Sequence, residues 1–154
     1  MPDALDDDVL MARTLELARA AAEMGEAPIG ALIADPGTGQ VLAQTHNRSI
    51  SLSDPTGHAE ILALREAGQV RENYRLTGMD LYVTLEPCAM CAGAISHARI
   101  RRLVYGASDP KGGAVAHGPK FFEQPTCHWR PEVKSGVRAD ESAELLRRFF
   151  RARR

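Results

Sequence analysis

The sequence predicts one α/β domain in which a mixed sheet is covered by helices on both faces. Residues 29–34 and 41–45 have the composition of strands, and the turn-forming run Pro36-Gly37-Thr38-Gly39 between them suits a hairpin. After this hairpin, helical and strand patterns alternate, which typically places helices against both faces of a sheet. The chain of 154 residues shows no linker or internal repeat, so we expect a single domain over residues 1–154.

The other elements follow from apolar spacing and from turn residues. Apolar residues at helical spacing predict a helix at about 6–24, ended by Gly25. The turn-forming run Asp54-Pro55-Thr56-Gly57 predicts that the next helix begins at His58. The remaining expected elements are, in order, a strand at 81–85, a helix at 88–98, a strand at 102–106, a strand at 132–138 and a helix at 139–153.

Composition narrows the class of protein. With 44% hydrophobic and 25% charged residues, the chain resembles an ordinary globular protein. No apolar run approaches eighteen residues, so no membrane span is expected. The first eight residues are acidic where a signal peptide would be basic and then apolar. Three cysteines suit a reducing cytoplasm better than a disulfide framework.

A histidine, two cysteines and a spare glutamate form the most informative pattern. His58 and Glu60 precede the run Pro87-Cys88-Ala-Met-Cys91 by about thirty residues. Zinc with four protein ligands is structural, whereas zinc with three keeps a position for water and acidifies it. We therefore expect His58, Cys88 and Cys91 to hold zinc and Glu60 to transfer protons, as in a hydrolytic enzyme.

Local geometry agrees with these roles. Cys88 and Cys91 are three residues apart at the start of a helix, so they share a face there, and the helix dipole favours their thiolates. Pro87 suits the first turn of that helix. Residues two apart point about 200° apart in mid-helix, so His58 and Glu60 can share a site only at a helix start.

Interpretations of these residues without a catalytic metal remain open. A Cys-x-x-Cys pair on its own also fits a redox motif, half of a structural zinc site or two buried thiols. We expect His46, His97 and His117 to be surface or core residues and Trp129 to pack. If Cys127 or His128 reached the metal, four ligands would make the site structural and leave Glu60 without a role.

Charge is distributed unevenly along the chain. Residues 1–77 contain six basic and twelve acidic side chains, whereas residues 78–154 contain thirteen and eight. Basic residues gather at 99–102 and at the C-terminus around Phe149 and Phe150. Arginines interleaved with aromatic rings suit phosphate contacts and base stacking, but a solvated helix with core phenylalanines is almost as natural.

The motifs together resemble the bacterial tRNA-specific adenosine deaminases of the cytidine-deaminase-like superfamily, whose signature is H-x-E…P-C-x-x-C. The likeness runs from about residue 9 to the end and is weakest at 108–131. The matching stretches are Ala27–Ala31, His46–Arg48, Asp54–Thr56, His58–Glu60, Asn73–Leu76, Leu81–Ala94, Ser96–Arg99, Val104–Ala107, Ala139–Glu141 and Phe149–Arg154.

The resemblance implies a three-layer α/β/α sandwich with a central five-stranded mixed sheet and one Zn²⁺ per subunit. It implies a homodimer that pairs through helices near the metal and converts the wobble adenosine of a tRNA anticodon arm to inosine, releasing ammonia. It assigns base reading to Asn47, pocket lining to Pro28 and Ile29, and further substrate contacts to Ala59, Glu86, Pro87 and Asp109. The anticodon arm would be held by Arg147, Arg148, Phe149, Phe150, Arg151 and Arg153, with Arg154 beside them.

Some positions depart from the family pattern and keep a second substrate class open. Gly57 stands where the family more usually has alanine, and Ser108 stands where an arginine that contacts nucleic acid is expected. Residues 114–131 do not resemble the usual segment. Because loops carry specificity on a fixed scaffold, a deaminase of a free nucleobase or nucleoside remains the alternative.

Overall fold

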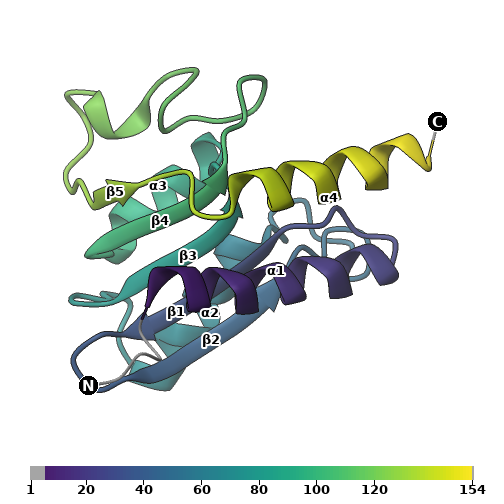
Figure 1. The fold of residues 1–154 in the computed structure, drawn as a ribbon. Helices are drawn as coiled ribbons and strands as arrows, with labels where there is room; N and C mark the ends of the chain where they lie inside the picture. The colour runs from purple at the N-terminus through teal and green to yellow at the C-terminus, as the bar shows by residue number, and fades with distance from the viewer. Residues whose placement is uncertain (1–5, 154) are drawn as a thin grey trace.

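The computed structural model describes residues 6–153 and contains a five-stranded sheet with the order β2-β1-β3-β4-β5 (Figure 1). Residues 1–5, which include Asp3 of the acidic N-terminal stretch, and Arg154 lie outside the described part. The expected hairpin is confirmed, because β1 and β2 pair antiparallel; β1 also pairs antiparallel with β3, whereas β3–β4 and β4–β5 are parallel. The strands are β1 (Gly30–Asp35), β2 (Gln40–His46), β3 (Asp80–Leu85), β4 (Arg102–Ala107) and β5 (Glu132–Lys134).

Four α-helices cover this sheet as the α/β/α sandwich requires. Figure 1 shows α1 and α4 side by side over one face, with α2 and α3 behind the other. Successive side chains of the central strand β3 enter two separate cores, because strand side chains alternate between the faces of a sheet: Leu81 and Val83 face α2 and α3, whereas Tyr82 faces α1. The helices are α1 (Asp7–Glu23), α2 (Ala59–Arg71), α3 (Ala89–Ala98) and α4 (Ala139–Arg151).

Helix α1 is fixed at both ends and along its length. The Asp6 carboxylate accepts hydrogen bonds from the amides of Asp8 and Val9, which caps the first turn. Gly25, with φ of 81°, ends the helix. A Cβ at Gly30 would overlap the Thr14 carbonyl oxygen, so a glycine in β1 lets the helix lie directly against the strand.

A buried ionic cluster ties α1 to the sheet away from the metal-binding end. The Nη2 atom of Arg102 in β4 lies 2.7 Å from Oδ1 of Asp7 and 3.2 Å from Oδ2 of Asp80. The Tyr82 hydroxyl donates a hydrogen bond of 2.6 Å to Oδ1 of Asp7. Burial alone would raise the pKa of Asp7, but the hydrogen bonds from Arg102 and Tyr82 outweigh it and hold the pKa well below its usual range. Asp7 therefore stays ionised and paired with Arg102 at the end of the sheet that lies away from the metal ligands.

Three local expectations need correction. β5 ends at Lys134 and not at 138, because Gly136 takes up a positive φ of 82° and turns the chain toward α4. Pro87 lies outside α3, since Cys88 is the N-cap residue and the helix begins at Ala89. The segment at 108–131 contains a short 3₁₀ helix (η2, Phe121–Glu123) that the sequence pattern did not suggest.

No helix within residues 6–153 is both long and apolar enough to cross a membrane.

Candidate active site

His58, Cys88 and Cys91 come together where two helices begin. His58 is the N-cap residue of α2, Cys88 is the N-cap residue of α3, and Cys91 lies in the first turn of α3. The Nδ1 atom of His58 is 3.6 Å from the Cys88 sulfur and 3.5 Å from the Cys91 sulfur. These three residues are the only group of candidate metal ligands among the described residues that clusters within 4.8 Å.

The spacing of the three ligand atoms fits tetrahedral zinc. Zn–S and Zn–N bonds of about 2.3 and 2.05 Å at a tetrahedral angle place nitrogen and sulfur roughly 3.6 Å apart. The observed separations of 3.5 and 3.6 Å agree with that value. One nitrogen and two sulfurs are also a ligand set that zinc prefers, and they leave a fourth position free for water.

The two cysteine thiols differ in how readily they lose a proton. A hydrogen bond from Cys91 lowers the pKa of Cys88 to about 4, while the same contact and burial raise the pKa of Cys91. Zinc binds cysteine as the thiolate, so metal binding would release a proton. Thiolate formation is assisted by the positive end of the α3 dipole.

Glu60 is the buried carboxyl beside these ligands. It lies in the first turn of α2, two residues after His58, and only 4% of its surface is exposed. Burial raises the pKa of Glu60 to about 7. A carboxyl group in that range can both accept and donate a proton near neutral pH, which general acid–base chemistry requires.

The loop from Asn47 to Gly57 carries the chain from β2 to His58 and is held at several points. Asn47, which is buried, donates its backbone amide to the Ile29 carbonyl over 2.9 Å, so the expected base-reading and pocket-lining residues are neighbours. Pro28 is buried beside them. The Glu26 carboxylate accepts the amides of Ile50 and Ser51, at 3.2 and 2.6 Å.

Ala59, Pro87 and Glu86 surround the ligands with backbone. Ala59 is fully buried and its carbonyl accepts the Thr45 hydroxyl over 2.8 Å. The Pro87 carbonyl accepts the Ala114 amide over 2.9 Å. The Glu86 side chain points into the 108–117 loop rather than toward the metal ligands, and it accepts the Asp109 amide over 3.0 Å.

The other histidines and Cys127 do not complete the metal site. His46 contacts the Asn47 carbonyl, His117 contacts Glu86, and His97 is exposed. Cys127 is buried and donates its thiol to the Trp129 carbonyl, while His128 is exposed. Among the described residues, the group that lies close enough together to hold a metal ion therefore consists of His58, Cys88 and Cys91. Trp129 packs as expected, and its indole donates to the Ile100 carbonyl.

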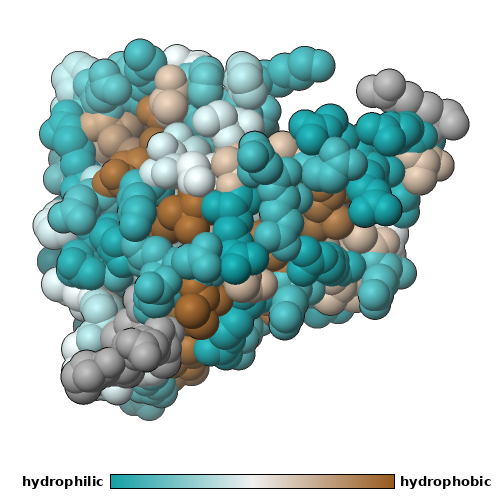
Figure 2. Space-filling view, in the orientation of Figure 1, coloured by the Kyte–Doolittle hydropathy of each residue, from teal (hydrophilic) through white to brown (hydrophobic). Residues whose placement is uncertain are grey.

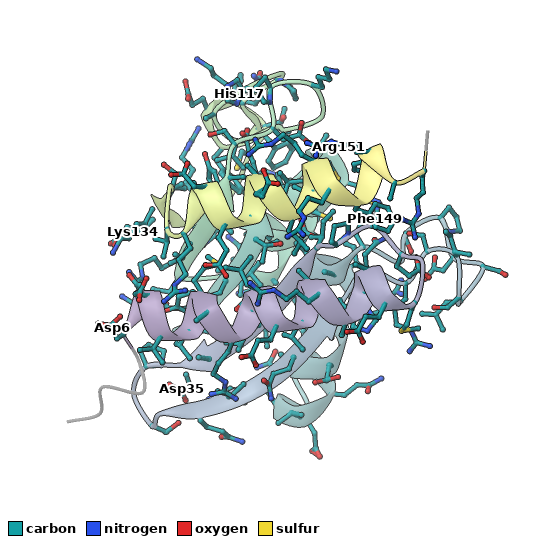
Figure 3. The ribbon with its side chains drawn as sticks, turned by 45° about the vertical axis from the view of Figure 1, so that its right-hand side comes forward. Asp6, Asp35, His117, Lys134, Phe149 and Arg151 are labelled. Carbon is teal, nitrogen blue, oxygen red and sulfur yellow. The ribbon has the colours of Figure 1, made fainter. Side chains whose placement is uncertain are left out.

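Helix α4 presents arginines to solvent beside an open hollow of about 500 Å³ (Figure 3). Arg147 and Arg151 line this hollow together with Asp109 and Lys111 from the facing loop. Figure 2 shows that this face of the molecule is largely hydrophilic, with smaller apolar areas. The outer arginines of this helix region are Arg147, which pairs with Glu144, then Arg148, Arg151 and Arg153.

The two phenylalanines of α4 lie in different environments. Phe149 is 9% exposed and its ring carries the Arg153 guanidinium 3.6 Å above its centre, so it belongs to the core beneath the helix. Phe150 is 49% exposed and lines the hollow. Of the two rings, Phe150 is therefore the one that a base could reach without rearrangement of the protein.

Comparison with known proteins agrees with this chemistry. Residues 5–107 match the family model of the cytidine and deoxycytidylate deaminase zinc-binding region. The chain belongs to this family. The enzyme is a zinc-dependent hydrolytic deaminase, and His58, Cys88 and Cys91 are the residues that could hold its zinc.

Within this family, the chain is more similar to tRNA-specific adenosine deaminases than to a guanine deaminase. The chain is 59% identical over 138 residues to the tRNA-specific adenosine deaminase of Agrobacterium fabrum, covering 89% of each chain. A solved structure described as a tRNA:A34 deaminase that edits A to I at the wobble position superposes with a TM-score of 0.86 at 56% identity, covering 88% of this chain and 97% of that one. Guanine deaminase from Bacillus subtilis is more distant, at 30% identity and a TM-score of 0.62 over 90% of each chain.

Sequence reasoning did not identify Glu26, Lys111 or His117 as parts of this region. Glu26 precedes a strand and looks like any surface acid, and His117 lies in the segment that matched the family least. Lys111 and Gly113 follow Asp109 in a turn-like run, which suggests a loop but no partner. Only the folded chain brings these residues to the site.

We expect wild-type protein to carry close to one zinc per chain and Cys88→Ala or His58→Ala to lose it, because two remaining ligands cannot complete a tight site. Metal content is measured by mass spectrometry after dialysis, with Cys127→Ala as the matched control that keeps its zinc. Full zinc occupancy in the Cys88→Ala/His58→Ala double variant would overturn the ligand assignment.

Proposed function

We propose that this enzyme deaminates the wobble adenosine of a tRNA anticodon arm to inosine. The observation that carries the proposal is a metal triad with a buried glutamate in a chain that matches tRNA-specific adenosine deaminases over most of its length. The α4 arginines beside the loop at 108–111 supply a surface suited to phosphate. The reaction replaces the exocyclic amine with a carbonyl oxygen.

Glu60 is the proton carrier in this scheme. When bound, zinc supplies a water molecule acidified toward neutral pH. Glu60 accepts a proton from the attacking water and delivers it to the ring nitrogen next to the amine-bearing carbon. It then takes the second proton from the newly bonded oxygen, which becomes the carbonyl oxygen, and passes this proton to the departing nitrogen, which leaves as ammonia. The raised pKa of Glu60 suits both directions of transfer.

The residues around Glu60 would orient the base. Asn47 lies beside Ile29, and both border the metal end of the sheet, where the carboxamide can read the edge of a purine. Pro28 and Ile29 provide an apolar wall. Backbone groups of Ala59, Glu86 and Pro87 would fix the reacting centre, because rigid amide dipoles require no reorganisation during the reaction.

Helix α4 would hold the phosphates on either side of the reacting nucleotide. Arg147 and Arg151 line the hollow, Arg148 is exposed beside them, and Phe150 offers an accessible ring. Asp109 and Lys111 form the opposite wall. A guanidinium can contact a phosphate through two hydrogen bonds, so a row of arginines can follow a bent RNA backbone.

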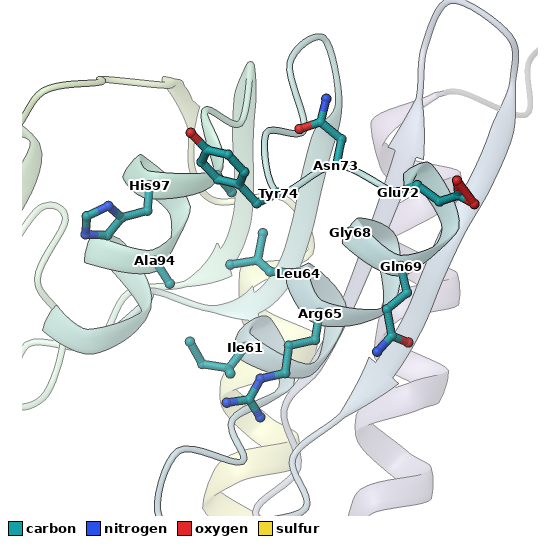
Figure 4. Close-up of a pocket in the computed structure, with 11 residues that line it drawn as sticks. Ile61, Leu64, Arg65, Gly68, Gln69, Glu72, Asn73, Tyr74, Ala94 and His97 are labelled. Carbon is teal, nitrogen blue, oxygen red and sulfur yellow. The ribbon is translucent and has the colours of Figure 1, made fainter.

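We also propose a cytoplasmic homodimer that pairs through α2 and α3. A hollow of about 760 Å³ lies between these helices. The apolar side chains of Ile61, Leu64 and Ala94 border it (Figure 4). Tyr74, which is 72% exposed, lies at its edge. The small residues of α3 allow a second copy to approach closely. This hollow lies on the outer side of the helices, away from Glu60, so it is better suited to a protein surface than to the reaction.

The first prediction from this scheme concerns Glu60. We expect Glu60→Gln to keep zinc and fold while deamination of an anticodon stem-loop falls by about 10³-fold, since the amide cannot carry protons. Inosine formation is followed under single-turnover conditions, with Glu16→Gln on the exposed face of α1 as control. Near-normal turnover in Glu60→Gln would leave the mechanism without its acid–base group.

A second prediction separates RNA from a free base as substrate. Replacing Arg147, Arg148 and Arg151 with glutamine should weaken stem-loop binding and reduce the log–log salt slope by about 2, because each phosphate contact contributes roughly 0.7. Binding is measured by fluorescence anisotropy over a salt series, with Arg13→Gln on α1 as control. If deamination of free guanine or adenosine is efficient and unaffected by these substitutions or by high salt, the free-base alternative is correct.

The dimer proposal is tested by sedimentation velocity at micromolar concentration. We expect a dimer that Ala94→Arg converts to monomer, since a charged side chain would then enter the apolar hollow. Val70→Arg, an exposed position on the same helix pair that does not line the hollow, is the control and should remain dimeric. A wild-type protein that sediments only as a monomer contradicts the proposal.

A further inference from the structure

The Glu86 carboxylate is a buried charge that the deamination scheme does not use. Its side chain is 0% exposed, although it directly precedes Pro87 and the metal ligand Cys88. It is directed away from the metal triad and does not belong to that cluster. Burying a charge costs free energy of folding unless hydrogen bonds compensate for the lost hydration. The hydrogen-bond partners of Glu86 therefore indicate which part of the structure this carboxylate holds in place.

The partners of Glu86 all belong to one loop. Oε1 accepts the Asp109 amide over 3.0 Å and contacts Nδ1 of His117 at 2.8 Å. Oε2 accepts the amides of Val115, Ala116 and His117 at 3.1, 2.9 and 3.2 Å. Five contacts from residues 109–117 therefore converge on one carboxylate, and the loop is wrapped around it.

The loop packs so closely against Glu86 that position 113 has room for glycine only. A Cβ at Gly113 would lie 2.5 Å from the Glu86 carboxyl carbon and 2.6 Å from the Asp109 carbonyl oxygen. Ala114 donates its amide to the Pro87 carbonyl over 2.9 Å, one residue from the metal ligand. The loop is consequently fastened to the Glu86–Pro87 segment through both a side chain and the backbone.

The same loop forms one wall of the hollow beside α4. Asp109 and Lys111 line it on the loop side, while Arg147, Phe150 and Arg151 line it on the helix side. Asp109 also accepts the Lys111 and Gly112 amides, at 3.2 and 3.0 Å, which fixes the turn between them. The position of this wall relative to Cys88 thus depends on the Glu86 contacts.

We propose that Glu86 is a positioning residue that sets the distance between the metal centre and the loop wall on which the RNA backbone rests. This inference rests on the proposed function, because it assigns the hollow to the substrate's phosphates. In this scheme the side chain of Glu86 contacts neither base nor metal. It acts through residues 109–117, and its loss should affect how RNA is seated more than how protons move.

Glu86→Gln is the informative variant, since the amide has the same shape but places an NH₂ group among donors. We expect zinc content to stay at the wild-type level, KM for an anticodon stem-loop to rise about 10-fold, and single-turnover kcat at saturating RNA to change less than 3-fold. Glu16→Gln, exposed on α1, is the matched control with wild-type values. All assays are run well below the melting temperature of the weakest variant.

A double-mutant cycle distinguishes positioning from general loss of stability. If Glu86 acts through the loop wall, Glu86→Gln should cost little further affinity once Lys111→Ala has removed that wall's cation, whereas unrelated effects would add. Additive losses, an unchanged KM in Glu86→Gln, or a loss confined to zinc binding would each overturn the proposal. Wild-type protein that does not deaminate the stem-loop would overturn the proposed function as well, so the two failures are distinguishable.

Discussion

Two helix N-termini that meet at one point determine how this site works. α2 begins after His58 and α3 begins after Cys88, and neither residue caps its helix through a side-chain hydrogen bond. Most helices use serine, threonine, asparagine or aspartate at that position. Here the capping position supplies a metal ligand instead. The positive ends of both helix dipoles then face the sulfur atoms and the Glu60 carboxyl, which favours negative charge.

The rest of the fold keeps these two helix starts in place. α2 and α3 pack against the sheet through small residues such as Ala63 and Ala92, both fully buried, so the helices lie close to the strands. On the opposite face, Gly30 lets α1 approach β1 equally closely. The Asp7–Arg102 cluster secures the far end of the sheet. Rigid packing around a preorganised site is what allows positioned groups to act without rearrangement.

Much of this arrangement could be predicted from the sequence because its signals are local. Helix periodicity, the hairpin turn and the Cys88–Cys91 spacing each involve residues close together in the sequence, and the H-x-E word at His58 is itself local. The structure confirms the helices and strands and brings His58, Cys88 and Cys91 together. The end of β5 could not be predicted, because it depends on Gly136 turning toward α4. The burial of Phe149 was equally out of reach, since either phenylalanine of α4 could have faced the core.

The least predictable feature is the different use of two buried glutamates. Glu60 and Glu86 are 4% and 2% exposed, and each stands within two residues of a metal ligand. Burial raises the pKa of Glu60 to about 7. Burial acts on Glu86 in the same direction, but hydrogen bonds from the Asp109 amide, His117 and neighbouring amides outweigh it and lower the pKa.

The consequences for stability have opposite signs. The depressed pKa of Glu86 stabilises the folded state above the carboxyl's unfolded pKa, and this contribution is lost as the pH falls through the folded value. In the metal-free protein, the raised pKa of Glu60 destabilises the folded state as the pH rises toward 7, because the unfolded chain then ionises more readily. Near neutral pH, Glu60 therefore lowers the stability of the folded state, whereas Glu86 raises it. Both residues lie within two positions of a candidate metal ligand, so their distance from the ligands in the sequence does not distinguish the two roles.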